Sequence, residues 1–172
     1  IENESIDNEE NQPEATDVRL HFVAVGDNIV HEAAYTDAER IADERGLGER
    51  YYFDTMYENF KETFINADVS FINQESMLGG DVYRVSGYPS FNTPDEMGDT
   101  LERLGFDVVN LASNHSYDMR GQGLLNCINY FKSTPIMTIG AYESREDYDN
   151  IRIFEKDGIK IIKAKDTLYK LE

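Results

Sequence analysis

Acidic, amide and imidazole side chains follow three apolar segments of this sequence. Asp27 comes after the first segment, Glu75 after the second, and the pair Asn114 and His115 after the third. In an open α/β sheet, ligands bind in the crevice beyond the carboxyl ends of the strands, so we expect these side chains to meet there. Asp, Glu and His are the side chains that hold a divalent cation. The sequence therefore predicts a metal-dependent site.

Further polar residues lie close to these positions. Asn73 alternates with Glu75, so both side chains project from the same side of an extended strand. His31 follows Asp27 by four residues, and Asp118 is spaced to hydrogen-bond a ring nitrogen of His115. The structural alternatives are a helix N-cap for Asp27, a surface or packed imidazole for His31 and an ordinary loop acid for Asp118. For Asn73 and Glu75 the alternative is plain solvation at the end of a strand.

The elements that would position these residues alternate between strands and helices up to residue 140. Apolar runs predict strands, and apolar residues spaced by three and four predict helices. Lys156-Asp157-Gly158 is a hairpin signal. The expected elements are a strand at 18–25, a core-facing helix at 52–67, a strand at 69–73, a helix from N-cap Thr93 to Gly105, a strand at 106–111, a helix at 121–132, a strand at 136–140 and a hairpin of 151–155 with 159–163. This order predicts an α/β fold with a mostly parallel sheet and an antiparallel edge hairpin.

The composition of the chain restricts the partners that it can bind and indicates how the chain is divided into segments. The 172 residues include 34 Asp and Glu against 16 Lys and Arg, a net charge of -18, which argues against nucleic acid or an anionic membrane surface as partner. Residues 1–17 predict a disordered acidic linker, residues 18–165 one domain, and residues 166–172 a tail. The single Cys127 excludes an intramolecular disulfide and fits a buried small hydrophobe. Because the chain starts with Ile, we expect a processed or trimmed product.

Three stretches of the chain resemble the bacterial capsule-synthesis family named for CapA, the poly-γ-glutamate capsule biosynthesis protein. They are residues 25–31 (VGDNIVH), 67–75 (ADVSFINQE) and 105–115 (GFDVVNLASNH). That family is similar to the calcineurin-like metallophosphoesterases, which implies a metallophosphatase-like layered α/β sandwich with a divalent metal, Mn, Zn, Mg or Fe, at the strand ends.

By motif position, the resemblance implies that Asp27, Glu75 and His115 are metal ligands. Asn114 would lie beside them as a ligand or oxygen-binding group, with Asn73 and His31 as further candidates. In a catalytic version the catalytic residues would be His115, Asn114 and Asp118, and the metal would activate a water or polarise a carbonyl or phosphoryl oxygen. His115 could instead be the general acid.

The chain departs from the family at three points. Ser113 stands where the family usually has Asn, and Arg120 where Gly is common. The resemblance also ends near residue 162, before the family's second half, so the chain is expected to be a truncated, N-terminal portion with an incomplete site.

The function expected from this resemblance is making, anchoring or releasing an anionic capsule polymer, by metal-dependent hydrolysis or amide transfer. The alternatives are a non-catalytic polymer-binding or assembly subunit and a metallophosphoesterase of small phosphoesters. Expected partners are the polymer, contacted by Arg84 and Arg120, or its synthase complex, and a second copy of the chain at an uncovered sheet edge. Expected localisation is the extracellular face of a bacterial membrane, through an upstream lipoprotein anchor, or secretion.

Overall fold

The structure, a computed structural model, describes residues 17–164 as an α/β fold. The predicted linker and tail therefore lie outside the described residues, except for Asp17. The elements in chain order are β1 (Phe22–Asn28), α1 (Glu32–Arg45), the 3-10 helix η1 (Asp54–Phe60), α2 (Lys61–Ile65), β2 (Val69–Gln74), α3 (Glu96–Arg103), β3 (Val108–Asn110), α4 (Arg120–Lys132), β4 (Met137–Ile139), α5 (Arg145–Asp149), β5 (Arg152–Lys156) and β6 (Ile159–Ala164).

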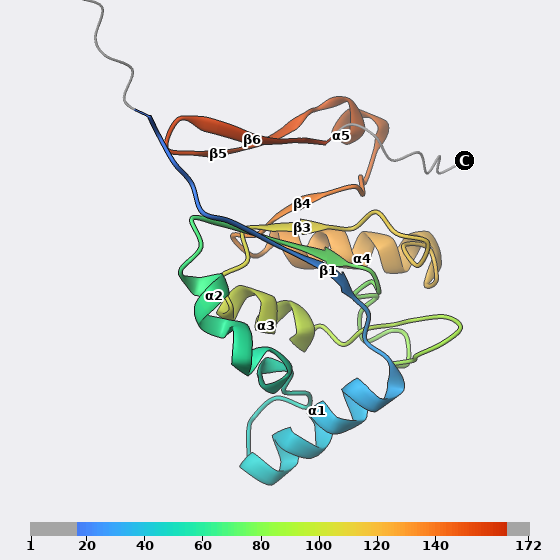
Figure 1. Ribbon diagram of the computed structural model, residues 1–172. Helices are drawn as coiled ribbons and strands as arrows, with labels where there is room; N and C mark the ends of the chain where they lie inside the picture. The colour runs from blue at the N-terminus through green and yellow to red at the C-terminus, as the bar shows by residue number, and fades with distance from the viewer. Residues whose placement is uncertain (1–16, 165–172) are drawn as a thin grey trace, which may run out of the picture.

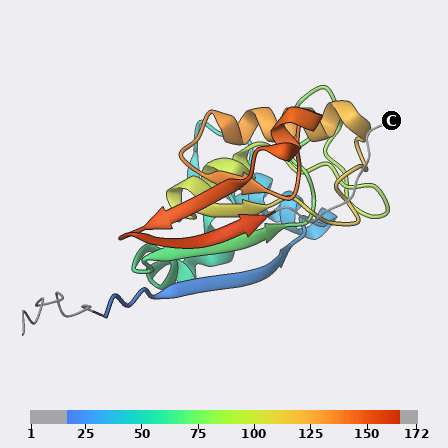
Figure 2. The ribbon, with the colours of Figure 1, turned by 90° about the horizontal axis from the view of Figure 1, so that it is seen from above.

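Four parallel strands form the main sheet in the order β1-β2-β3-β4. Figure 1 shows α1, α2 and α3 below this sheet and the β5–β6 hairpin above it. In the view from above, the hairpin runs across one face of the molecule while β1 lies at its margin (Figure 2). The hairpin is antiparallel, as predicted, and forms a two-stranded sheet of its own. The predicted α/β class with a mostly parallel sheet is confirmed.

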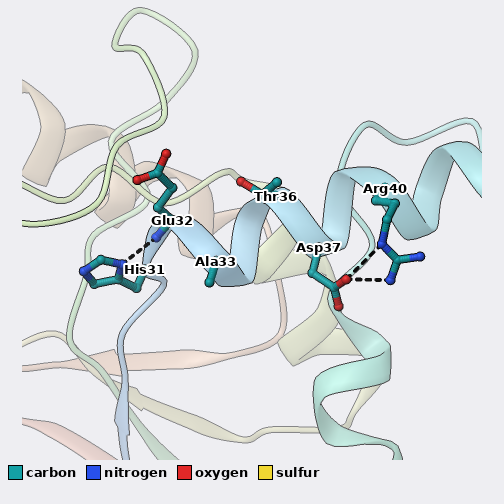
Figure 3. A pocket seen from close by; sticks show the side chains of 6 residues that line it. All are labelled: His31, Glu32, Ala33, Thr36, Asp37 and Arg40. Carbon is teal, nitrogen blue, oxygen red and sulfur yellow. Dashed lines mark hydrogen bonds and ion pairs between the residues drawn. The ribbon is translucent and has the colours of Figure 1, made fainter.

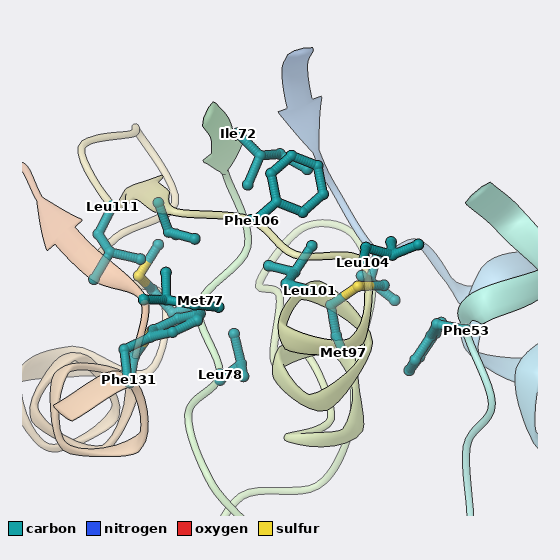
Figure 4. Close-up of a cluster of buried hydrophobic side chains, with 14 of the residues drawn as sticks. Phe53, Ile72, Met77, Leu78, Met97, Leu101, Leu104, Phe106, Leu111 and Phe131 are labelled. Atoms are coloured by element: carbon teal, nitrogen blue, oxygen red, sulfur yellow. The ribbon is translucent and has the colours of Figure 1, made fainter. Parts of the chain in front are cut away.

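The hydrophobic core lies between the sheet and the helices. Figure 4 shows Ile72 of β2 and Leu101 of α3 in this cluster, together with Phe131 of α4. Gly98 lets α3 approach α4 closely, because a Cβ there would collide with the Tyr130 ring. Cys127 is fully buried in the same cluster, and burial raises the pKa of its thiol to about 12. It is a core residue, as its helical neighbours predicted.

The first strand lies further along the chain than predicted. It runs from Phe22 to Asn28, and its register with β2 shifts between Val25 and Asp27. Gly26 therefore sits at a bulge inside the strand and does not close it. Since bulges re-aim side chains at sheet edges, this irregularity sets the direction of Asp27.

The segment 52–67 is not one core-facing helix. It divides into η1 and α2, and a 3-10 helix has three residues per turn, so the predicted apolar stripe rotates away from the core. Phe53 and Phe64 are buried, whereas Met56, Phe60 and Ile65 are 47%, 60% and 48% exposed.

The start of α3 also differs from the prediction. Thr93 does not cap the helix, because its hydroxyl donates to Oγ and O of Ser76 at 2.7 and 3.1 Å. Asp95 occupies the N-cap position without a side-chain cap bond. Two helices, α1 and α5, were not predicted at all. No helix among the described residues has the length and apolar character needed to cross a membrane.

Candidate active site at three strand ends

The structure brings the carboxyl ends of β1, β2 and β3 together, as the strand-end argument predicted. The register aligns Asp27 of β1 with Asn73 of β2, and Asn73 with Asn110 of β3. Asn73 Nδ2 donates to Asp27 Oδ1 at 2.6 Å, and Asn110 Nδ2 donates to Asn73 Oδ1 at 2.6 Å. Asp27 is therefore held by neighbours within the sheet and does not cap a helix.

Glu75 lies directly after β2, and its side chain is 15% exposed. Burial raises the pKa of its carboxyl group, and the charge of Asp27 and a hydrogen bond with it raise the pKa further, while His115 lowers it. The Glu75 backbone is fixed on both sides: its N–H donates to Asn28 O at 3.1 Å, and its carbonyl accepts from Ser113 Oγ at 2.7 Å. Two carboxyl groups thus share one small region of the site.

His115 faces Glu75 with one ring nitrogen and Asp118 with the other. His115 Nδ1 lies 2.8 Å from Asp118 Oδ2, the contact that the sequence spacing predicted, and His115 Nε2 lies 4.0 Å from Glu75 Oε1. A carboxylate oxygen only accepts hydrogen bonds, so Nδ1 carries the proton in neutral His115 and Nε2 keeps its lone pair. That lone pair is directed to the side where the two carboxyl groups lie.

The turn that carries His115 is tied to β2 through Ser113. Ser113 Oγ accepts from the backbone N–H of His115 at 3.0 Å while it donates to Glu75 O. The serine that departs from the family pattern therefore fixes the imidazole and the Glu75 backbone relative to each other.

Phe91 packs between the two histidines of this region. Its ring contacts His115 edge-to-face at 4.7 Å between centroids and His31 at 5.9 Å. Its backbone N–H donates to Asp118 Oδ2 at 2.7 Å, so Asp118 binds the loop and the imidazole with the same oxygen.

His31 lies beside the cluster as the N-cap of α1. Its Nδ1 accepts from the backbone N–H of Glu32 at 2.9 Å, which leaves this nitrogen unable to bind a metal. It also lines a hollow along α1 with Glu32, Ala33, Thr36, Asp37 and Arg40 (Figure 3). Asp27, Glu75 and His115 are absent from that lining, so the hollow is adjacent to the cluster and does not contain it.

The remaining candidates are exposed to solvent. Asn114 is exposed, and its side chain makes no hydrogen bond to another described residue. Arg84 and Arg120 are exposed and form no ion pair within residues 17–164. Arg120 has φ of 56°, a left-handed conformation that favours glycine, which accounts for the Gly common there in the resembling family.

Asn110 and Phe91 contact the candidate site but were not predicted from the sequence to do so. Asn110 had a usable signal, because it is a polar residue that ends the apolar run of β3 and aligns with Asn73 in a parallel register. Phe91 had none, since its position depends on the fold of the loop that follows β2.

The donor set matches a divalent cation in chemistry, with two carboxylates and one imidazole that a carboxylate orients. Among residues 17–164, however, no three His, Cys, Asp or Glu side chains are grouped closely enough to enclose a metal ion.

Comparison with known proteins identifies the family. Residues 21–167 match the family described as bacterial capsule synthesis protein PGA_cap. The chain is also 31% identical over 67 residues to the capsule biosynthesis protein CapA of Bacillus anthracis, a match that spans 39% of this chain and 16% of that protein. The four-stranded parallel sheet with its hairpin is consistent with a metallophosphatase-like fold. The chain belongs to the CapA-like family of bacterial capsule synthesis proteins.

Proposed function

We propose that Asp27, Glu75 and His115 bind one divalent cation and that the chain acts on an anionic capsule polymer, poly-γ-glutamate, or on its anchor. The reaction would be metal-dependent hydrolysis or amide transfer. The observation that carries this proposal is the convergence of two carboxyl groups and an oriented imidazole at three neighbouring strand ends.

The electrostatics of the cluster support a cation there. The pKa of Glu75 is raised by burial and by Asp27, so its ionised form is less favourable there than in water. A cation between the carboxylates would offset that repulsion. When bound, such an ion supplies an activated water or polarises a carbonyl or phosphoryl oxygen. In this proposal Asp118 keeps His115 Nε2 directed at the cation, and Asn114, exposed beside it, meets the substrate.

The proposed substrate raises a charge problem, since both it and the chain, with a net charge of -18, are anionic. We assign Arg84 and Arg120 to the polymer carboxylates, because they are exposed cations without an ion pair in the described part of the chain. The proposed setting is the outer face of the membrane, reached by secretion or through an upstream lipid anchor, with the synthase complex or a second copy as further partners.

One observation favours a second candidate, a non-catalytic subunit that binds polymer or helps assembly. In the described residues the three ligand candidates are not grouped tightly enough to enclose an ion. A protein that kept the family fold without turnover would show this arrangement.

The test is cleavage of poly-γ-glutamate by the purified chain with Mn²⁺, followed by gel filtration of the polymer. We expect the polymer to shorten with the wild type and with Asp43→Ala, an exposed α1 acid, and to remain long with Asp27→Ala or with a chelator. Polymer binding without shortening would establish the non-catalytic subunit, and turnover of an aryl phosphate in place of polymer would establish a phosphoesterase. The proposal would be refuted if the chain neither binds nor cleaves the polymer and does not turn over the aryl phosphate.

A further inference from the structure

Three side chains from three adjacent strands form a continuous chain of hydrogen bonds that ends at Asp27. Asn110 of β3 donates to Asn73 of β2, and Asn73 donates to Asp27 of β1, with both distances 2.6 Å. We call this chain the amide relay. Its members lie at aligned register positions, so the parallel pairing of the strands itself sets their order.

The backbone after β3 fixes the direction of the relay. Asn110 Oδ1 accepts from the backbone N–H of Ala112 at 3.3 Å, and its Nδ2 also donates to Ala112 O at 3.2 Å. A carboxamide has one donating and one accepting end, so this backbone contact decides which end of Asn110 faces Asn73. Asn73 must then offer its oxygen to Asn110 and its NH₂ group to Asp27.

Gly140, directly after β4, leaves the space that the Asn110 side chain occupies. It has φ of 84°, and a Cβ there would lie 2.6 Å from Asn110 Oδ1 and 2.6 Å from the Ala112 Cβ. The fourth strand end therefore closes around Asn110 and restricts its rotamers. The backbone and Gly140 therefore fix Asn110 at one end of the relay. Asp27, at the other end, is exposed, and its carboxylate is oriented by Asn73.

We propose that Asn110 is a positioning residue, which fixes the Asp27 carboxylate by way of Asn73. In this arrangement Asn73 acts on Asp27 through its NH₂ group, while its oxygen accepts from Asn110. The role toward a cation rests on the proposed function, whereas the relay exists without a metal.

The test combines a measurement without metal and one with metal on the same variants. Asn110→Leu has a similar size but no amide, and Asn110→Asp keeps the acceptor for Ala112 but cannot donate. Asn150→Ala, at an exposed position after α5, serves as the control. The first readout is the side-chain NH₂ signal of Asn73 by NMR in the metal-free protein, and the second is Mn²⁺ affinity, with the melting temperature measured in parallel.

We expect both Asn110 variants to lose the hydrogen-bonded shift and exchange protection of the Asn73 NH₂ group, with Asn150→Ala unchanged. Mn²⁺ affinity should fall about 10-fold in both variants, at the low end of losses from residues that orient a ligand. Unchanged Asn73 signals would overturn the relay. The positioning role would be overturned if the relay is lost but Mn²⁺ affinity is unchanged. It would also be overturned if the loss of affinity only follows the melting temperature across the variants. If the wild type binds no Mn²⁺, the proposed function fails, and the NMR readout alone decides the relay.

Discussion

Replacing Asp118 by alanine is expected to weaken Mn²⁺ binding by about 10- to 100-fold, the range measured for residues that orient metal-bound histidines. Asp118 Oδ2 lies 2.8 Å from His115 Nδ1 and accepts from Phe91 N at 2.7 Å. Without that oxygen the imidazole loses both its fixed tautomer and its fixed rotamer, so the Nε2 lone pair is no longer held toward Glu75. Calorimetric titration with Mn²⁺ measures the loss.

Asp118→Asn provides the matched comparison. Its carbonyl oxygen has the same shape and can accept from both donors, but it lacks the negative charge. Its affinity should lie between those of the wild type and Asp118→Ala. If the wild type and both variants bind Mn²⁺ with equal affinity, Asp118 only holds the loop at Phe91 and does not position His115 for metal binding.

Asp95→Asn is expected to raise the free energy of unfolding by about 1–2 kcal/mol at pH 7. Burial raises the pKa of Asp95 to about 6, with Asp81, Glu96 and Asp99 adding to the shift, and its Oδ1 is buried without a hydrogen-bond partner. A shift of one unit corresponds to about 1.4 kcal/mol, and we halve the total because Asp95 is only partly buried.

The size of this effect depends on pH. The pKa of Asp95 is higher in the folded protein than in the unfolded chain, so the folded state retains the proton more strongly. The stabilisation of the folded state by this protonated carboxyl group is complete below about pH 4 and is lost as the pH rises toward about 6. The advantage of Asp95→Asn should therefore be absent near pH 4 and fully developed above pH 6.

Urea unfolding at pH 4, 5, 6 and 7 checks this profile, with Glu102→Gln as an exposed control on the same helix. A gain from Asp95→Asn that is equal at every pH would show that the charge of Asp95 is not its cause, because a packing effect of neutral groups does not depend on pH.

The strands could be predicted from the sequence, but α1, α5 and the division of residues 52–67 into η1 and α2 could not. Buried strands of a parallel sheet are continuous apolar runs, and Val69 and Val108 lie in such runs. In contrast, α1 buries only two alanines, Ala38 and Ala42, so no apolar stripe marks it. The error at η1 had the opposite cause: a helical spacing of apolar residues was present, but 3-10 geometry turned Met56 and Phe60 outward.

The convergence of the strand ends and the contact between His115 and Asp118 could be predicted, whereas the hydrogen bonds that link Asp27, Asn73 and Asn110 could not. Asp27, Glu75 and His115 converge because parallel strands end at one edge of the sheet. The orientation of the Asn73 amide depends instead on the register between β2 and β3 and on the backbone at Ala112, which residue types do not reveal. For the same reason, the spacing of Asn73 to Glu75 could not show that the Asn73 oxygen accepts from Asn110.

If Asp27, Glu75 and His115 hold one divalent cation, the purified chain should retain that cation, so its metal content is the decisive measurement. The purified chain is exposed to Mn²⁺ or Zn²⁺, desalted and subjected to elemental analysis, beside His115→Ala and the control His21→Ala, an exposed histidine before β1. We predict about one ion per chain in the wild type and in His21→Ala, and almost none in His115→Ala. No retained metal in the wild type, or the same metal content in His115→Ala, would contradict the claim.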